Sequence, residues 1–200
     1  MKVYHGSSVL FEKFDLSHVM EGDGKVKFGW GVYVTEKYNT AAHYAYNKKR
    51  PENKAFYVYT VEIPDRKPDN CLSLLKRVPV IKSIIERTQK KLGETVPEEA
   101  KAEGIPFRKW LANKLTGVNK SVRQMTEKAT VQGEKAASEF LLGIGVDLIE
   151  WPYNWQKPEE EKNFAVLSDG KVRVLRIDKV ELDSKNHQLI EGSQTLVKEF

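Results

Sequence analysis

The stretch GWGVYVTEKYNTAAHYA, residues 29–45, changes its periodicity halfway along. After two glycines, the run VYVT combines β-branched and aromatic residues, which favours a short strand. The second half is rich in alanine, and Asn39 is a typical N-cap for a helix over residues 40–48. We therefore predict a strand-to-helix corner, with Tyr33 on the strand and Tyr44 on the helix. Taken alone, each tyrosine would also suit a core position.

Strand-like runs flank this corner in both directions. KVYHG is typical of a strand ending at Gly6, and AFYVYTVEIP at residues 55–64 is the clearest strand pattern. Later in the chain, VDLIEW is followed by NFAVLSD and KVRVLRI, which surround Asp169 and Gly170. Because Asp-Gly is a strong turn signal, the last two runs are predicted to form a hairpin. The tail at residues 183–200 is polar, and no pattern assigns it.

Between these β-rich parts, residues 72–143 have helical spacing. Pro79, Pro97 and Pro106 suit the first turns of helices. Five apolar residues fall on one helical stripe: Leu74, Val78, Ile81, Ile85 and Leu92. The sequence therefore predicts a single α+β domain over residues 1–182. Both ends of the chain would build one sheet system around a helical insertion.

The composition is that of a globular domain. Of 200 residues, 40% are hydrophobic and 30% charged, enough for one domain with a real core. The single cysteine, Cys71, excludes an internal disulfide, and we expect a buried, inert thiol. The chain contains neither an apolar leader nor a run of about 18 apolar residues, so we expect a cytoplasmic protein that does not span a membrane.

The charge is concentrated in the middle of the chain. The formal net charge is +5, and residues 71–120 hold 11 Lys and Arg against five Asp and Glu. This excess suits an acidic partner such as nucleic acid, or else a solvated helical surface. The candidate acceptor-binding residues are Lys76, Arg77, Lys82, Lys90, Lys91, Arg108 and Lys109.

Three stretches form a motif in a fixed order: VYHGSS, the corner described above, and EEEKNFAVLSDGKVRVLRI. Singly they are ordinary, since His5 suits a core turn and the glutamates suit a solvated charge run. Together they resemble the ADP-ribosyltransferase family, in the His-Tyr-Glu branch that includes poly(ADP-ribose) polymerases and diphtheria-type toxins. That branch has His-Gly at a strand end, Gly-x-Gly-x-Tyr with a second tyrosine eleven residues on, and a glutamate that begins a late strand.

Within that family, the chain is similar to transferase domains of polyvalent proteins from phages and mobile elements. The shared elements are YHGS, F-x-K-F-D, GWG-x-Y, EIPD and an Asn-aromatic-x-Val strand, all present here. The resemblance covers about 80 residues near the two ends and leaves the middle uncovered. It implies a split β-sheet core carrying a helical insertion at about residues 72–143. It also implies a toxin or host-takeover factor, with an antitoxin protein as a possible partner.

The resemblance implies that NAD⁺ is the substrate and that nicotinamide is released. Tyr33 and Tyr44 would sandwich the nicotinamide ring, which their aromatic faces attract. His5 would hydrogen-bond a ribose hydroxyl, and Gly6 would let the ligand approach the backbone. Further pocket candidates are Ser7, Gly31 and Thr35. No metal is expected, because the histidines lack ligand spacing with each other or with acidic residues.

The main departure from the family pattern is Asn163, which stands where a glutamate is expected. Its amide can accept a hydrogen bond from a ribose hydroxyl but supplies no negative charge. Glu161 lies two residues earlier and would share its face on a strand. It would orient or deprotonate an acceptor, or supply the missing charge; alternatively it only ends a solvated loop.

The sequence thus predicts an ADP-ribosyltransferase that modifies a macromolecule, with RNA or DNA ahead of protein as the acceptor. The alternatives are a catalytically degenerate NAD- or RNA-binding module, and an NAD glycohydrolase, in which water is the acceptor.

Overall fold

The computed structural model describes residues 1–19, 26–46, 55–117 and 127–200. The strands are β1 (Lys2–Ser7), β2 (Val32–Thr35), β3 (Phe56–Glu62), β4 (Cys71–Ser73), β5 (Leu148–Pro152), β6 (Lys162–Val166), β7 (Arg173–Val180) and β8 (Thr195–Glu199). The helices are α1 (Tyr38–Ala45), α2 (Lys82–Leu92), α3 (Glu98–Lys101), α4 (Gly104–Thr116) and α5 (Glu127–Leu142). Short 3-10 turns are η1 (Leu16–His18) and η3 (Asp169–Lys171).

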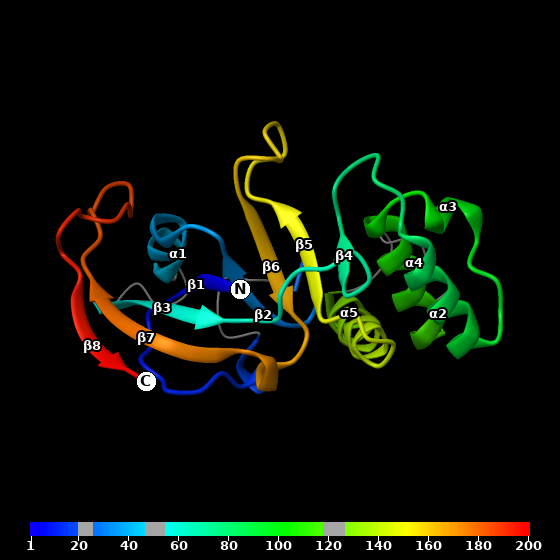
Figure 1. Ribbon diagram of the computed structural model, residues 1–200, viewed down its shortest axis with the longest axis horizontal. Coiled ribbons are helices and arrows are strands. Elements are labelled where there is room, and N and C mark those ends of the chain that lie inside the picture. The colour runs from blue at the N-terminus through cyan, green and yellow to red at the C-terminus, as the bar shows by residue number, and fades with distance from the viewer. Residues whose placement is uncertain (20–25, 47–54, 118–126) are drawn as a thin grey trace.

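The strands form one mixed sheet in the order β4-β5-β6-β2-β1-β3-β7-β8, which confirms the α+β class. Only β4 and β5 are parallel to each other among these neighbours. In the middle of the sheet, β1 and β2 share a single register pair, Tyr4 with Thr35. By contrast, β1 and β3 are paired from Lys2 to Ser7. The strands on the two sides of this junction run in clearly different directions (Figure 1). The sheet therefore consists of two halves that meet at β1 and β2.

The hairpin predicted around Asp169 and Gly170 is wrong. β6 pairs with β2 and β5, whereas β7 pairs with β3 and β8, so the two strands lie in different halves. The Asp-Gly pair does make a tight turn, η3. Its Asp169 carboxylate accepts a hydrogen bond from the amide of Leu16 at 3.0 Å. A turn motif describes only its own few residues. It cannot show that β7 pairs with the longer strand β3 instead of with β6.

Apolar side chains fill both faces of the sheet. On one face, Val32, Val34 and Phe164 join a core between the two halves. On the other, Ile149 and Ala165 pack against the insertion helices. Figure 1 shows α2, α3 and α4 gathered at one end of the molecule, beyond β4, with α5 below β4 and β5, while α1 lies beside β1. The expectation of helices between two β-rich parts agrees with this arrangement.

Three boundaries differ from those predicted. Leu72 belongs to β4 and pairs with Ile149, and the first insertion helix begins only at Lys82. Short apolar runs suit a buried strand as well as a helix, so periodicity alone cannot separate them. At the corner, α1 begins at Tyr38 with Lys37 at the N-cap, and Asn39 lies inside the helix. The helix ends at Ala45, with Tyr46 as an extended C-cap, whereas the predicted end at residue 48 lies outside the described residues.

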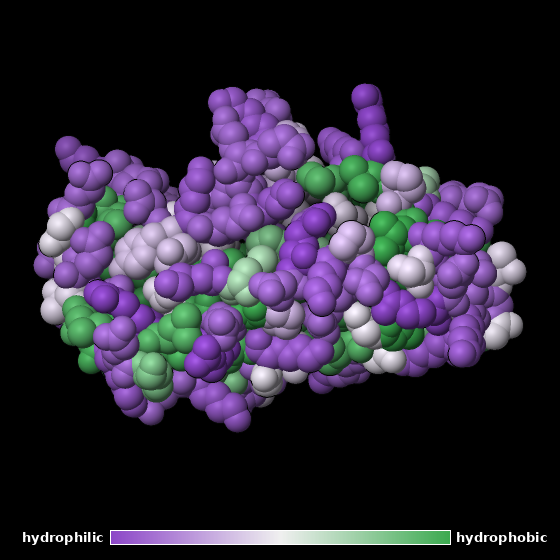
Figure 2. Space-filling view, in the orientation of Figure 1, coloured by the Kyte–Doolittle hydropathy of each residue, from purple (hydrophilic) through white to green (hydrophobic). Residues whose placement is uncertain are grey.

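The tail that no sequence pattern assigned contains β8. This strand pairs with β7 and forms an outer edge of the sheet. All five of its residues are exposed, and Leu196, Val197 and the following Phe200 bring apolar surface there. Apolar atoms are visible at this end of the molecule in Figure 2.

Candidate active site

The pairing of β2 with β6 brings distant polar residues together. Thr35 is the register partner of Asn163, and directly opposed residues project from the same face of a sheet. Glu161 lies two residues before Asn163, and the Thr35 hydroxyl donates to its carboxylate at 2.7 Å. Thr35 is 2% exposed, and Asn163 and Glu161 are each 4% exposed. The three side chains form a buried polar row beside the junction of the two sheet halves.

Glu161 is therefore not the end of a solvated acidic loop, the alternative left open by the sequence. Its neighbours Glu159 and Glu160 are exposed, while its own carboxylate is held by Thr35 and lies 3.7 Å from the Lys37 ammonium. Its backbone carbonyl accepts from the amide of Tyr153 at 3.0 Å. An approaching acceptor group would compete with Thr35 and Lys37 for this carboxylate.

Asn163 has a different environment. Its other register partner is Trp151 on β5, so the indole and the Thr35 hydroxyl flank it. Its side-chain amide makes no hydrogen bond with any residue in the described parts of the chain. Neither polar atom of this amide is both fully buried and unpaired, so the amide reaches solvent, where water or a bound molecule can pair with it. Asn163 is thus able to accept from and donate to a bound molecule.

Tyr33 projects from β2 on the same face as Thr35. Its hydroxyl donates to the Gly29 carbonyl at 3.0 Å and accepts from the Phe28 amide at 3.0 Å. Its ring centroid lies 5.1 Å from that of Trp151. Burial raises the pKa of this hydroxyl far above its usual value, so Tyr33 stays a neutral, fixed aromatic.

Tyr44, on α1, is 53% exposed. Its ring meets the edge of Tyr153 with centroids 6.4 Å apart. Partial burial, together with the nearby Tyr153 and Glu161, raises the pKa of Tyr44 to about 12. Tyr44 therefore stands near Glu161 of the polar row, and it makes no ring contact with Tyr33 among the described aromatic pairs.

His5 bridges the two sheet halves. Its Nδ1 lies 2.7 Å from the Tyr33 carbonyl oxygen, which can only accept, so Nδ1 carries the proton. The ring sits edge-on to Phe11, Phe14 and Tyr59, at centroid distances of 6.1, 5.0 and 6.0 Å. Burial lowers the pKa of the imidazole, which favours the neutral ring. In the neutral tautomer Nε2 is an acceptor, as a ribose hydroxyl requires.

The proposed role of Gly6 needs correction. A Cβ at this position would lie 1.8 Å from the Ala41 carbonyl oxygen, so this side of Gly6 is filled by α1 rather than open to a ligand. Ser7 accepts from the amide of Val9 at 3.0 Å and acts as a turn hydroxyl. At Gly31, a Cβ would lie 2.6 Å from the Val166 carbonyl oxygen. Both glycines serve close backbone packing around the site.

Arg108 is a second correction. It is 2% exposed, and its Nε lies 2.9 Å from the Glu134 carboxylate, so it cannot track phosphates on the surface. Helical spacing predicts that Arg108 lies on a helix, but it cannot show that Glu134 on α5 is its ion-pair partner. Five of the remaining candidates are exposed and one, Lys109, is half-buried: Lys76, Arg77, Lys82, Lys90, Lys91 and Lys109. Lys82 lies 3.6 Å from Glu86, and the Lys91 ammonium sits over the Phe140 ring.

Sequence reasoning missed Lys37, Tyr153 and Trp151, which surround the polar row. The aromatic-rich run PYNWQ was a signal that could have indicated Tyr153. Its loop joins β5 to β6 and projects beyond the sheet (Figure 1). Nothing in the sequence singled out Lys37. Over the described ranges, there is no group of three or more His, Cys, Asp or Glu side chains able to hold a metal ion. Within the same ranges, no helix is long and apolar enough to cross a bilayer.

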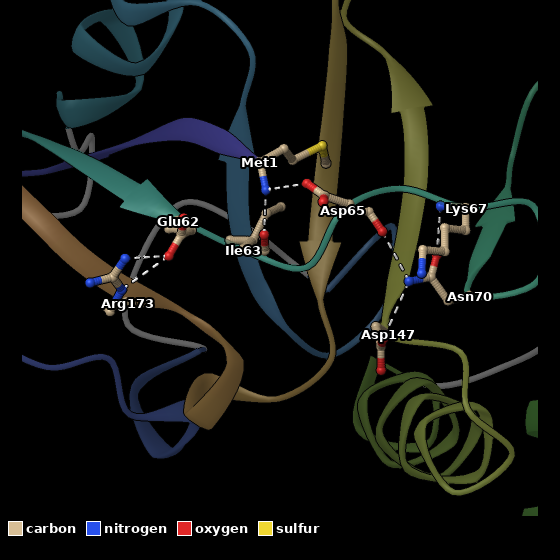
Figure 3. A network of polar contacts seen from close by, with 8 residues as sticks. All are labelled: Met1, Glu62, Ile63, Asp65, Lys67, Asn70, Asp147 and Arg173. Atoms are coloured by element: carbon tan, nitrogen blue, oxygen red, sulfur yellow. Dashed lines mark hydrogen bonds and ion pairs between the residues drawn. The ribbon is translucent and has the colours of Figure 1, made fainter.

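A separate groove of about 510 Å³ lies on the β3–β7 side of the junction. Figure 3 shows the polar network beside it, where the Met1 ammonium donates to the Ile63 carbonyl at 2.6 Å and to Asp65 at 2.8 Å. Asn70 extends the network to the other half of the sheet by donating to the Asp65 carbonyl and to Asp147. The network ties the β3–β4 connection across both halves, and it includes Ile63 and Asp65 of the EIPD element but none of the candidate site residues.

The fold and site define an α+β protein with a cluster of polar and aromatic side chains beside the junction of two sheet halves. A family model described as "protein of unknown function (DUF3990)" matches residues 1–81, and the chain is similar to that family over this part. The matched part includes His5, Tyr33 and Tyr44 but not Glu161 or Asn163. No curated protein matches the chain.

Proposed function

We propose that this protein is an NAD⁺-consuming ADP-ribosyltransferase. The observation that carries the proposal is the β2–β6 register, which sets Thr35 beside Asn163, while His5 contacts the backbone of Tyr33. Three motifs that lie far apart in the sequence thus converge at one junction. The two sheet halves also agree with the split sheet that the family resemblance implies.

In the proposed reaction, the bond between the ribose C1′ and the nicotinamide nitrogen breaks. The bonding electrons leave with nicotinamide, the acceptor's lone pair forms a new bond to C1′, and the acceptor's proton goes to a base or water. Tyr33 and Tyr44 would hold the aromatic ring from β2 and α1. Both are neutral, so their faces attract a cationic ring without competing charge.

The ribose would be held from both halves of the sheet. The acceptor Nε2 of neutral His5 suits one hydroxyl, and the side-chain amide of Asn163 suits another. The positive charge that develops on the ribose needs a negative group nearby. Glu161 is the carboxylate of the polar row, and Lys37 and Thr35 restrain it.

We test the function with NAD⁺ carrying separate labels on nicotinamide and on adenylate, incubated with the protein and a cell lysate. We expect nicotinamide release and transfer of the adenylate label to macromolecules. Tyr44→Ala should lower the rate at limiting NAD⁺ roughly tenfold, since one stacking face contributes about 1 kcal/mol or more. Phe200→Ala is the matched control, because Phe200 is also 53% exposed and lies outside the site. Absence of nicotinamide release by the wild type would reject the proposal.

The same experiment separates the alternatives. Release without any labelled macromolecule would indicate an NAD glycohydrolase. Binding of NAD⁺ without release would indicate a degenerate module, which the lack of charge at Asn163 favours.

For the acceptor, we propose a nucleic acid, on the basis of the exposed basic residues of the insertion. Nuclease treatment should remove the adenylate label from the acceptor, and the rate of transfer should fall steeply as the salt concentration rises. Label that survives nuclease but is lost with protease would reject a nucleic-acid acceptor.

A further inference from the structure

The helical insertion contacts the loop that leads into the corner. We call residues 26–31 the glycine loop. From α4, Arg108 donates from Nη2 to the carbonyl oxygen of Lys27 at 2.7 Å. From α5, the Ser138 hydroxyl accepts from the amide of Trp30 at 2.9 Å. The insertion thus holds the glycine loop near both of its ends.

The charged part of this contact is deeply buried. Arg108 is 2% exposed and Glu134 is 6% exposed. Burial raises the pKa of Glu134, against the opposing effect of Arg108. Within the described chain, Nη1 of Arg108 has no hydrogen-bond partner. Because a buried ion pair rarely stabilises a fold more than apolar residues of similar size, stability alone does not explain this pair.

The glycine loop is also held from the inside by Tyr33. The hydroxyl of Tyr33 donates to Gly29 and accepts from Phe28, so the ring and the loop move together. The loop has little slack, since Gly29 has φ +113° and a Cβ there would lie 2.7 Å from Cδ1 of Ile149. A shift of α4 or α5 against the sheet would therefore move the loop and, with it, the Tyr33 ring.

We propose that Arg108 and Ser138 are positioning residues, through which the helical insertion sets the place of the Tyr33 ring and so the fit of NAD⁺. The proposal rests on the proposed function for its second half only. Its first half, the coupling of the insertion to Tyr33, is a property of the protein without any ligand. The helical insertion would then position Tyr33, in addition to any contact that it makes with an acceptor.

The first experiment measures hydrogen exchange of peptides covering residues 26–33 in the protein alone. Ser138→Ala removes the acceptor for Trp30 and should speed exchange of the loop about tenfold. Thr88→Ala is the matched control. Thr88 is 0% exposed on α2, and its hydroxyl donates to Ile84 of the same helix at 2.8 Å, so the change removes a buried hydroxyl of the insertion away from the loop. Loop exchange equal in the two variants would overturn the proposal.

The second experiment measures nicotinamide release against NAD⁺ concentration for the same variants. Ser138→Ala should raise KM about tenfold, whereas Thr88→Ala at a similar melting temperature should leave KM unchanged. A double variant, Arg108→Gln with Glu134→Gln, removes the Lys27 contact without leaving a lone buried charge, and should repeat the effect of Ser138→Ala.

Faster loop exchange with an unchanged KM would overturn the positioning role. If the wild type consumes no NAD⁺, the proposed function fails. The exchange measurement still decides in that case whether the insertion holds Tyr33.

Discussion

Replacing Gly6 by alanine tests how closely α1 is seated on the sheet. A Cβ at Gly6 would lie 1.8 Å from the carbonyl oxygen of Ala41 and 2.7 Å from the amide nitrogen of Ala45. Both are backbone atoms, and Cβ contacts under 3.0 Å essentially never occur. The helix would have to move away from β1, because neither atom can rotate aside.

The magnitude follows from what the helix buries. Ala41, Ala42 and Ala45 are at most 1% exposed, and the first two pack against Val58. A gap of about 0.5–1 Å forfeits a quarter to a half of each dispersion contact. Overpacking typically costs about 1–3 kcal/mol, and backbone displacement puts Gly6→Ala at the upper end. For a chain of this size, 3 kcal/mol corresponds to a melting temperature about 6–12 °C lower.

Thermal unfolding followed by circular dichroism would measure the difference. Gly170→Ala is the control, because a Cβ there meets only the Ser168 hydroxyl, at 3.6 Å, and the backbone φ is not positive. It should change stability by less than about 1 kcal/mol in either direction. A melting temperature for Gly6→Ala within about 2 °C of the wild type would refute the close seating of α1.

Three further predictions concern buried titratable groups. Because burial lowers the pKa of His5, the unfolded chain binds a proton there first, so the free energy of unfolding should fall as pH drops below about 6.5. His5→Gln should flatten that part of the urea-midpoint profile, and an unchanged slope would contradict it. Burial raises the pKa of Cys71, so a thiol reagent should label the folded protein at least about 100-fold more slowly than the urea-unfolded chain; equal rates would contradict a buried thiol. Arg66→Ala takes from the buried Glu150 carboxylate its ion-pair partner and should cost about 2–4 kcal/mol in chemical denaturation, less than a fully buried pair because Arg66 is 40% exposed. A loss under about 0.5 kcal/mol would show that water replaces Arg66.

Local chemistry explains which strands could be predicted. β3 has a continuous β-branched and aromatic run that ends at Pro64, so its place was recognisable without any partner. β8 is short and exposed along its whole length, and it forms a strand because β7 offers an edge for pairing. The false hairpin at Asp169 has the same origin: a turn motif describes four residues, whereas strand order depends on the whole sheet.

The site shows a similar division. Spacing alone placed Glu161 and Asn163 on one face, because alternation along a strand is a local rule. The contact of Glu161 with Thr35 depends on the β2–β6 register, which spans 126 residues of sequence. Arg108 was taken as a surface charge since its partner, Glu134, lies on another helix. Charged residues show their burial only when the pairing of elements is known.

The order of strands has a consequence for synthesis of the chain. Glu62 on β3 and Arg173 on β7 lie 111 residues apart in sequence, with the four insertion helices between them. The contacts of α4 with α5 join residues that are closer in sequence. We therefore expect the insertion to fold during synthesis before β7 has been made and can pair with β3. During that interval the edge of β3 is unpaired, which makes it the segment where chaperones would bind and where misfolding would begin.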